Sequence, residues 1–188
     1  MFEVVRLRDT LLIAPALFAQ ERLAVDIELR KKYANRVLAG QGLVVAVHSV
    51  DAVDDATVYQ GSGHACALVA FRLVVFRPRP NEVLTGAVQE HLPGKGLRVS
   101  LGFFDDVFVP KMFLKQQTAF DEEQKMWYWE VNGNKGYFFI GAEIRFRVVE
   151  VKFDATASGQ PALELAHAPM VVYGDVVAAG LGMVAWWS

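Results

Sequence analysis

The sequence predicts an α+β chain in which a compact α+β unit precedes a small antiparallel β-barrel of the OB type. The barrel is indicated by residues 94–114, GKGLRVSLGFFDDVFVPKMFL, where apolar and polar residues alternate on both sides of Gly102. Two strands joined at a glycine and closed by a short helical turn are typical of the middle of such a barrel, whose second and third strands usually face oligonucleotides. The α+β unit is indicated by the order of strand, helix and further strands before residue 77. Between them, Phe76–Pro80 carries two prolines that interrupt helix and central strand alike, which predicts domains at 1–79 and 80–188.

In the first domain, the β-branched and apolar residues of Phe2–Ile13 predict a strand. Pro15 suits the first turn of a helix that we expect to reach about Tyr33. The apolar residues of this helix fall in two rows, Phe18, Val25 and Leu29 in one, and Leu23, Ile27 and Ala34 in the other. Two readings stay open: one wide buried face, or one row on the domain's own sheet and the other on a partner. Strands are then expected within 37–53 and at 67–76.

In the second domain, the expected strands are Val83–Leu92, the two around Gly102, Lys125–Val131, Ile144–Phe153 and Met170–Ala178. All of these are expected to belong to the barrel, with a turn at Asn132–Gly136 and a loop at 154–169. The alternation changes phase near Val149, which predicts a β-bulge of the kind common where small barrels bend. Two adjacent tryptophans, Trp186 and Trp187, follow at the end, and adjacent residues of an extended chain cannot easily both point inwards.

Composition narrows the classes of function. Residues 1–80 carry ten basic and eight acidic side chains, and residues 81–188 carry nine and thirteen, so the barrel half is the more acidic. A net charge of −2 argues against tight binding of duplex DNA, and any RNA contact should be local and weak. No stretch reaches the roughly 20 apolar residues of a membrane span, so no membrane partner is expected. The start of the chain is not expected to be a signal peptide, because Glu3 and Asp9 interrupt its basic part and Pro15 divides its apolar run. The single cysteine, Cys66, suits a reducing compartment.

No catalytic or metal-binding pattern emerges, so we expect neither an enzyme nor a cofactor. His64 and Cys66 lie two residues apart, with no third group in view to orient the imidazole. The chain's four histidines lack the spacing of a zinc site. Asp105 and Asp106 are strand neighbours that face opposite sides, which favours a turn or a partner contact over a metal. Phe103 and Phe104 fit either the barrel core or an exposed contact.

Several segments together resemble a known family. The junction FRPRPNEVLTG resembles the join between the two domains in the larger stalk subunit of cellular RNA polymerases, a group that also has archaeal members. Four further segments, SLGFFDDVFVP, FDEEQKMWYWE, GAEIRFRV and GLGMVAWW, are similar to the RNA polymerase III member. The resemblance covers nearly the whole chain, and it is the combination that makes it specific.

The resemblance implies an RNP-like αβ domain that docks on the polymerase, followed by an OB fold. It implies a nuclear, non-catalytic subunit that pairs with the smaller stalk subunit, docks on the core subunits and contacts nascent RNA and initiation factors. The docking surface is expected to include the loop Gln60–His64. Together with the apolar patterns, this gives the expected partner-binding residues Phe18, Val25, Leu29, Gly61, Gly63, His64, Trp186 and Trp187.

Single-stranded RNA is expected to meet cations around the central barrel segment, with a second set on a later strand. The expected RNA-binding residues are Lys95, Arg98, Phe104, Lys111, Lys115, Arg145 and Arg147. In one respect the chain departs from RNA-binding OB domains of the ribosomal-protein type: Arg98 and about Pro110 stand where these often carry an aromatic residue and a histidine. Two alternatives to a stalk subunit stay open. One is a free-standing OB-fold RNA-binding factor, which would be monomeric and would need no two-faced apolar helix, and the other is an enzyme of unknown chemistry, which would need a pocket with convergent polar groups.

Overall fold

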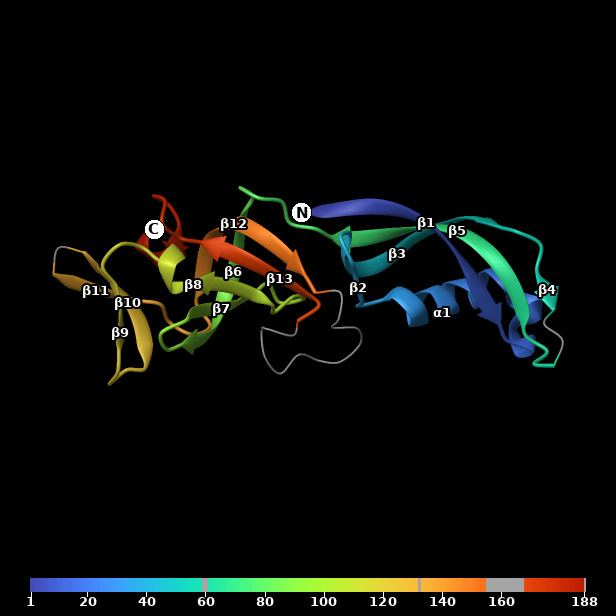
Figure 1. Cartoon of the computed structure of the whole chain (residues 1–188), viewed down its shortest axis with the longest axis horizontal. Helices are drawn as coiled ribbons and strands as arrows, with labels where there is room; N and C mark the ends of the chain where they lie inside the picture. The colour runs from blue at the N-terminus through green and yellow to red at the C-terminus, as the bar shows by residue number, and fades with distance from the viewer. Residues whose placement is uncertain (59–60, 132, 155–167, 188) are drawn as a thin grey trace. The chain divides into compact units, whose positions relative to one another are not determined.

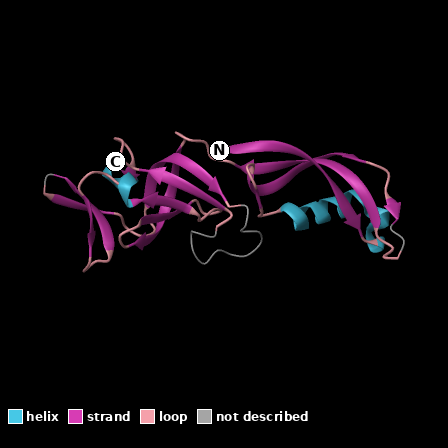
Figure 2. Ribbon diagram, viewed as in Figure 1, coloured by secondary structure: helices cyan, strands magenta, loops and turns pink. Residues whose placement is uncertain are grey.

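The computed structural model describes residues 1–58, 61–131, 133–154 and 168–187. The chain divides into two compact units, Met1–Arg77 and Pro78–Ser188, and each is described by itself (Figure 1). The fold is mixed α+β, as predicted, and in the described residues the α-helix lies in the first unit and the second unit consists mainly of strands (Figure 2). In the described residues, no helix combines the length and apolarity needed to cross a membrane.

The first unit is an antiparallel sheet with a helix on one face. Its elements are β1 (Phe2–Ile13), η1 (Pro15–Gln20), α1 (Glu21–Tyr33), β2 (Val37–Leu38), β3 (Gly42–Val53), β4 (Thr57–Val58) and β5 (Ala65–Phe76). The strand order is β1-β5-β3-β2, and β4 also pairs with β5. Pro15 begins a 3-10 turn rather than the α-helix itself, which starts six residues later.

The helix settles which of its apolar rows is buried. Val25 and Leu29 are fully buried against the inward residues of β5, together with Ala24. Leu23 and Ile27 remain 48% and 40% exposed, so the second row does not pack on this unit's own sheet. One wide buried face is therefore wrong, and the burial of one row on the unit's own sheet is confirmed, except that Phe18 of that row is exposed; the contact of the second row with a partner stays a prediction.

Close approach of β3 to β5 depends on a glycine. Gly42 has a φ of +123°, and a Cβ atom placed on it would lie 2.2 Å from the Phe76 carbonyl oxygen. Only glycine fits such a backbone without strain. This position starts β3 beside the last residue of β5, and β3 then follows β5 with three register shifts.

The second unit is built on a closed five-stranded barrel. The barrel strands are β6 (Val83–Leu92), β7 (Gly96–Ser100), β8 (Val107–Pro110), β12 (Glu143–Phe153) and β13 (Met170–Asp175). Their order is β13-β8-β7-β6-β12, and the pairing of β12 with β13 closes the ring. The pair β8 and β13 is parallel and the others are antiparallel, which is the pairing of an OB fold. The expected bulge is present between Val148 and Glu150.

A separate sheet, rather than the barrel, contains the expected strand Lys125–Val131. It consists of β9 (Thr118–Asp121), β10 (Met126–Val131) and β11 (Asn134–Tyr137). Asn134–Gly136 belong to β11, so the expected turn at Asn132–Gly136 is too long, and Asn132 itself lies outside the described residues. The turn residues η2 (Lys111–Phe113) lead into this sheet from β8. Sequence alternation identifies a strand but not its sheet, because successive side chains point to opposite faces in any sheet.

The last elements follow β13, which ends at Asp175 rather than Ala178. They are β14 (Gly182–Met183), paired with β12, and η4 (Val184–Trp186). The expected loop at 154–169 falls largely outside the described residues.

His91 links the barrel to the separate sheet. Its Nδ1 accepts a hydrogen bond from the Trp127 backbone N–H at 3.1 Å, and the indole of Trp127 donates to the Gly96 carbonyl at 3.0 Å. Both side chains are buried. Burial lowers the pKa of His91, with a smaller opposing effect of the Phe138 carbonyl, and the neutral ring is the form that can accept the Trp127 N–H.

The two faces of α1 give a first prediction. Leu29→Ala should reduce the free energy of unfolding by about 2–5 kcal/mol, because it leaves a cavity in a fully packed core. Leu23→Ala removes the same atoms from an exposed position and should change it by less than about 0.5 kcal/mol. Urea unfolding followed by far-UV circular dichroism measures both, and equal losses would contradict the assignment of the rows.

His91 gives a second prediction. Since its pKa is lower in the folded chain, the unfolded chain takes up the proton first as the pH falls below about 6.5. The stabilising contribution is therefore present above that pH and is lost as the pH falls further. The variant His91→Gln keeps a hydrogen-bond acceptor but does not titrate, so its stability should fall less between about pH 7 and pH 5. Chemical denaturation across that range tests this, and parallel curves for the two proteins would contradict it.

Candidate nucleic-acid and subunit interfaces

The outside of the barrel carries an aromatic pair. Phe108 on β8 and Tyr173 on β13 are register partners, and their ring centroids are 6.1 Å apart in an edge-to-face arrangement. The neighbouring residues Val107 and Val172 point into the core and are fully buried. Phe108 therefore lies on the surface that OB folds use for oligonucleotides. We did not predict these two residues as a site, although the alternation Val107-Phe108-Val109 places Phe108 opposite the buried valines.

Cations surround this aromatic pair. Arg98 is the register partner of Phe108 on β7, and the Lys152 ammonium lies 5.1 Å from the centre of the Tyr173 ring. Lys95 and Lys111 are exposed at one end of the β7–β8 pair, where the Lys111 N–H donates to the Lys95 carbonyl at 2.8 Å. The strands thus place two expected RNA-binding lysines at the end of the strand pair that carries Phe108, and the Lys111 ammonium lies 5.8 Å from the centre of the Trp127 ring.

Arg98 is engaged within the chain. Its guanidinium donates to Asp106 at 3.0 Å and to the Asp105 carbonyl at 3.2 Å, and its side chain is only 21% exposed. Burial raises the pKa of Asp106, and the Arg98 charge acts against that effect. The pair leaves Arg98 little charge to offer a phosphate, so its expected role as a free RNA contact is corrected.

Phe104 is a core residue and not an RNA contact. It is 6% exposed, whereas Phe103 is 46% exposed. The turn explains the difference, since the Leu101 N–H donates to the Phe104 carbonyl at 2.8 Å and folds the second ring back towards the barrel. Of the two adjacent rings, the exposed one is therefore Phe103.

Lys115 is a buried structural cation. It is 7% exposed, and its ammonium donates to the carbonyls of Val177 and Ala178 at 3.4 and 3.0 Å. The same ammonium lies 4.9 Å from the Trp129 ring centre and 5.2 Å from that of Trp187. Burial lowers the pKa of Lys115, while nearby Asp175 raises it. This arrangement ties the end of the chain to the barrel and excludes Lys115 as an RNA contact.

The second expected set of RNA cations is also largely paired. Arg147 binds Asp175 through two hydrogen bonds of 2.7 and 3.0 Å, and Asp175 is buried. Arg145 is partly buried and its Nη1 lies 3.4 Å from the Gly180 carbonyl oxygen. The Arg147 side chain is still 40% exposed, but Asp175 offsets its charge, so both arginines remain predicted RNA contacts, with a reduced charge to offer at Arg147.

The expected partner-binding residues divide into buried and exposed ones. Val25 and Leu29 lie in the unit's own core and are not available to a partner. Phe18 is 44% exposed, and Leu23 and Ile27 extend the exposed apolar surface along α1. We call Phe18, Leu23 and Ile27 the helix row. The sequence shows both apolar rows of the helix but does not indicate which of them packs against the sheet.

The loop between β4 and β5 is on the surface where it is described. Gly61 and Gly63 are exposed, and His64 is partly buried with its Nδ1 3.1 Å from the Ser62 carbonyl oxygen. Gln60 lies outside the described residues. Both glycines have positive φ, at +104° and +69°. These residues remain candidates for a subunit contact.

The terminal tryptophans take different roles. The Trp186 ring packs 5.1 Å from Trp129 and 4.8 Å from Phe138, centroid to centroid, so Trp186 belongs to the unit's interior packing. Trp187 is 44% exposed, and its indole donates to the Leu181 carbonyl at 3.1 Å. The tryptophan that can reach a partner is therefore Trp187.

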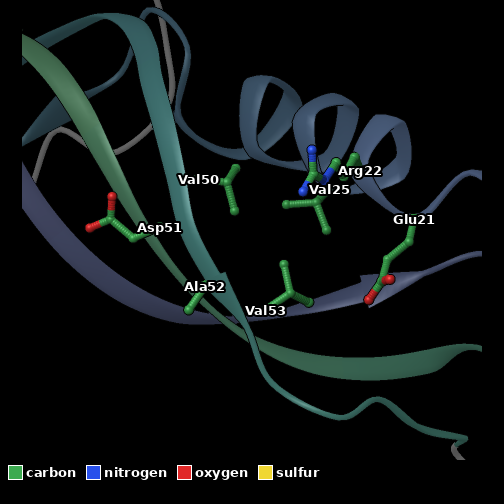
Figure 3. Close-up of a pocket in the computed structure, with 7 residues that line it drawn as sticks. All are labelled: Glu21, Arg22, Val25, Val50, Asp51, Ala52 and Val53. Atoms are coloured by element: carbon green, nitrogen blue, oxygen red, sulfur yellow. The ribbon is translucent and has the colours of Figure 1, made fainter.

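One pocket of about 510 Å³ lies between the start of α1 and β3 (Figure 3). Its floor is apolar, with Val25, Val50 and Val53, and Glu21 and Arg22 lie on the helix side. The Asp51 carboxylate points away from it (Figure 3). No nucleophile and base converge there, and the described residues hold no group of three His, Cys, Asp or Glu side chains that could bind a metal ion.

Comparison with known proteins agrees with this picture. Residues 82–187 match the family described as RNA polymerase III subunit Rpc25, and residues 8–63 match the SHS2 domain found in the N terminus of Rpb7p, Rpc25p and MJ0397. The RNA polymerase III subunit RPC8 of Bos taurus is 37% identical over all of this chain and 99% of its own length, and that of Schizosaccharomyces pombe is 34% identical over both full lengths. The polymerase subunit Rpo7 of Saccharolobus solfataricus is 24% identical over 83% of this chain and 86% of its own. The chain therefore belongs to the Rpb7/Rpc25 family of RNA polymerase stalk subunits, in the branch described as RNA polymerase III subunit Rpc25.

Proposed function

We propose that the chain is the larger stalk subunit of RNA polymerase III, a non-catalytic nuclear protein that acts as a scaffold and a weak guide for RNA. It forms a heterodimer with the smaller stalk subunit, docks on the core through its first unit, and contacts nascent RNA and initiation factors. The observation that carries the proposal is the helix row, Phe18 of η1 with Leu23 and Ile27 of α1, which leaves three large apolar side chains exposed on two successive elements. Contiguous apolar surface of this kind marks protein interfaces.

The second unit supports the RNA part of the proposal. An aromatic pair with lysines on the outside of an OB barrel is a combination that binds single-stranded nucleic acid with little sequence preference. Its affinity should be low, because Arg98 and Arg147 are neutralised within the chain and the unit is acidic overall. A free-standing OB-fold factor would use the same surface. The helix row, which such a factor does not need, favours the stalk subunit.

Co-purification tests subunit association. Replacing Leu23 and Ile27 together by Asp should reduce recovery of the smaller stalk subunit and polymerase core subunits about tenfold or more, because it places charge in an apolar contact. Met112→Asp is the matched control, since Met112 is an exposed apolar residue of the second unit. Normal recovery with the Leu23/Ile27 variant would show that the helix row is not an interface.

RNA binding separates charge from stacking. In the heterodimer, changing Lys95 and Lys111 to Ala should flatten the slope of log affinity against log salt by about 1.4, from roughly 0.7 for each phosphate contact on a single strand. Phe108→Ala should weaken binding by about 1–3 kcal/mol and leave that slope unchanged. Adding Arg98→Ala should change the slope little further, since Arg98 is already paired with Asp106. A titration of oligouridine followed by fluorescence anisotropy measures all three, and unchanged binding in the Lys and Phe variants would restrict the barrel to protein contacts.

A further inference from the structure

The sheet of the first unit has a second face, opposite α1. The odd-numbered residues of β5 point to the helix and are all buried, and Val5 and Leu7 of β1 pack with them. The even-numbered residues of β1 and β5 therefore point the other way. In Figure 1, α1 runs along one side of β1, β3 and β5, and no other described element of this unit covers the opposite side.

Register pairing between β1 and β5 orders the side chains on this outer face into rungs. From one end to the other these are Val4 with Val74, Arg6 with Arg72, Arg8 with Ala70, Thr10 with Leu68, and Leu12 with Cys66. The face is thus apolar at both ends and basic in the middle. We call these ten residues the outer face.

The basic middle is not balanced within the chain. Arg6 and Arg72 lie directly opposite each other, a like-charge pair that destabilises a sheet unless an anion joins it. One carboxylate, that of Asp51, serves both, at 2.9 Å from Arg6 and 3.1 Å from Arg72. Among the ion pairs of the described residues, Arg8 has none. The three guanidinium groups of this face are thus accompanied by one carboxylate, which two of them share, and this leaves a surplus of two positive charges.

The apolar ends are exposed to solvent. Val4 and Leu12 are 55% and 56% exposed, and Leu68 is 41% exposed. The register partners of β5 on β3 are small on this side, with Ala46 opposite Val74 and Ala52 opposite Ala70.

We propose that the outer face binds an acidic, amphipathic segment of another polymerase subunit, with carboxylates on Arg6, Arg8 and Arg72 and apolar side chains on Val4, Leu12 and Leu68. This rests on the proposed function, because it takes the partner to be a polymerase subunit. The distance from Val4 to Leu12 along β1 is about 27 Å, from roughly 3.4 Å per residue. A matching segment has about 8 extended or about 18 helical residues, with its acidic residues in the middle.

Two other occupants fit less well. A second copy of the chain would bring the same positive surplus against itself, which opposes pairing of two outer faces. Single-stranded RNA would be attracted to the arginines, but it binds such sheets by stacking on exposed rings. The ten residues of the outer face include no aromatic residue. The next rung beyond Val4 pairs Phe2 with Phe76, with ring centroids 5.6 Å apart, but only Phe2 is exposed, so this end offers one ring and not a row of rings.

Site-directed cross-linking in the intact enzyme tests the proposal. The full chain, with p-benzoylphenylalanine in place of the exposed Thr10, is purified within polymerase III, irradiated, and the cross-linked peptide is identified by mass spectrometry. The expected product is a segment of another subunit with Asp or Glu between apolar residues. A cross-link to RNA, to a second copy or to a basic segment overturns the proposal, and so does the absence of any cross-link.

Charge reversal provides the second arm. Arg8→Glu should lower the cross-link yield about tenfold, because it opposes like charges in the contact while leaving the Asp51 pairs in place. Replacing the acidic residues of the cross-linked segment by Lys should restore the yield with Arg8→Glu. The matched control is Arg36→Glu, an exposed position after α1 with the same change of charge, which should leave the yield unchanged. An Arg8→Glu yield equal to that of the parent overturns the proposal.

The two proposals fail in different ways. Loss of the unmodified chain from purified polymerase III would contradict its function as a stalk subunit. Retention of the chain in the enzyme, with no cross-link to an acidic segment at Thr10, would contradict the outer-face proposal alone.

Discussion

The strict alternation of side chains along paired strands is the constraint on which both units depend. In β5 it commits every odd-numbered residue to the core under α1, over the whole length that pairs with β1. The even-numbered residues are then necessarily placed on the other face, whatever their chemistry. Arg6 and Arg72 therefore face each other across the strands, although their charges repel, because neither strand can slip by one residue without exposing the core.

The same constraint shapes the barrel. Val107, Val109 and Val172 fill its interior, and this forces Phe108 and Tyr173 to the outside. The parallel pairing of β8 with β13 brings these two rings from distant parts of the sequence to one place. A candidate RNA surface thus arises from core packing on the other side of the same strands.

Charge neutralisation within the chain decides which cations are left for partners. Arg98, Arg147 and Lys115 are held by Asp106, by Asp175 and by carbonyls and indole rings, respectively. Lys95 and Lys111 sit at the end of a strand pair, where they stay exposed. The second unit is acidic overall, and several of its cations are also paired within the chain. The exposed cations that remain near the strand pair of Phe108 are Lys95 and Lys111.

The sequence by itself indicated the long strands, the helix and the family, but not short strands such as β9, β11 and β14. Local patterns, such as the alternation around Gly102, the phase change near Val149 and the prolines after Phe76, depend on neighbouring residues and can be read along the chain. Which apolar row of α1 is buried, which of Phe103 and Phe104 is exposed, and which cations are paired were decided only by the tertiary structure. These depend on residues far apart in sequence: Asp175 reaches Arg147 across 28 positions, and Lys115 meets Val177 and Ala178 more than 60 positions away. A local sequence pattern does not show which distant residues will meet, because burial and charge pairing depend on how the folded chain packs.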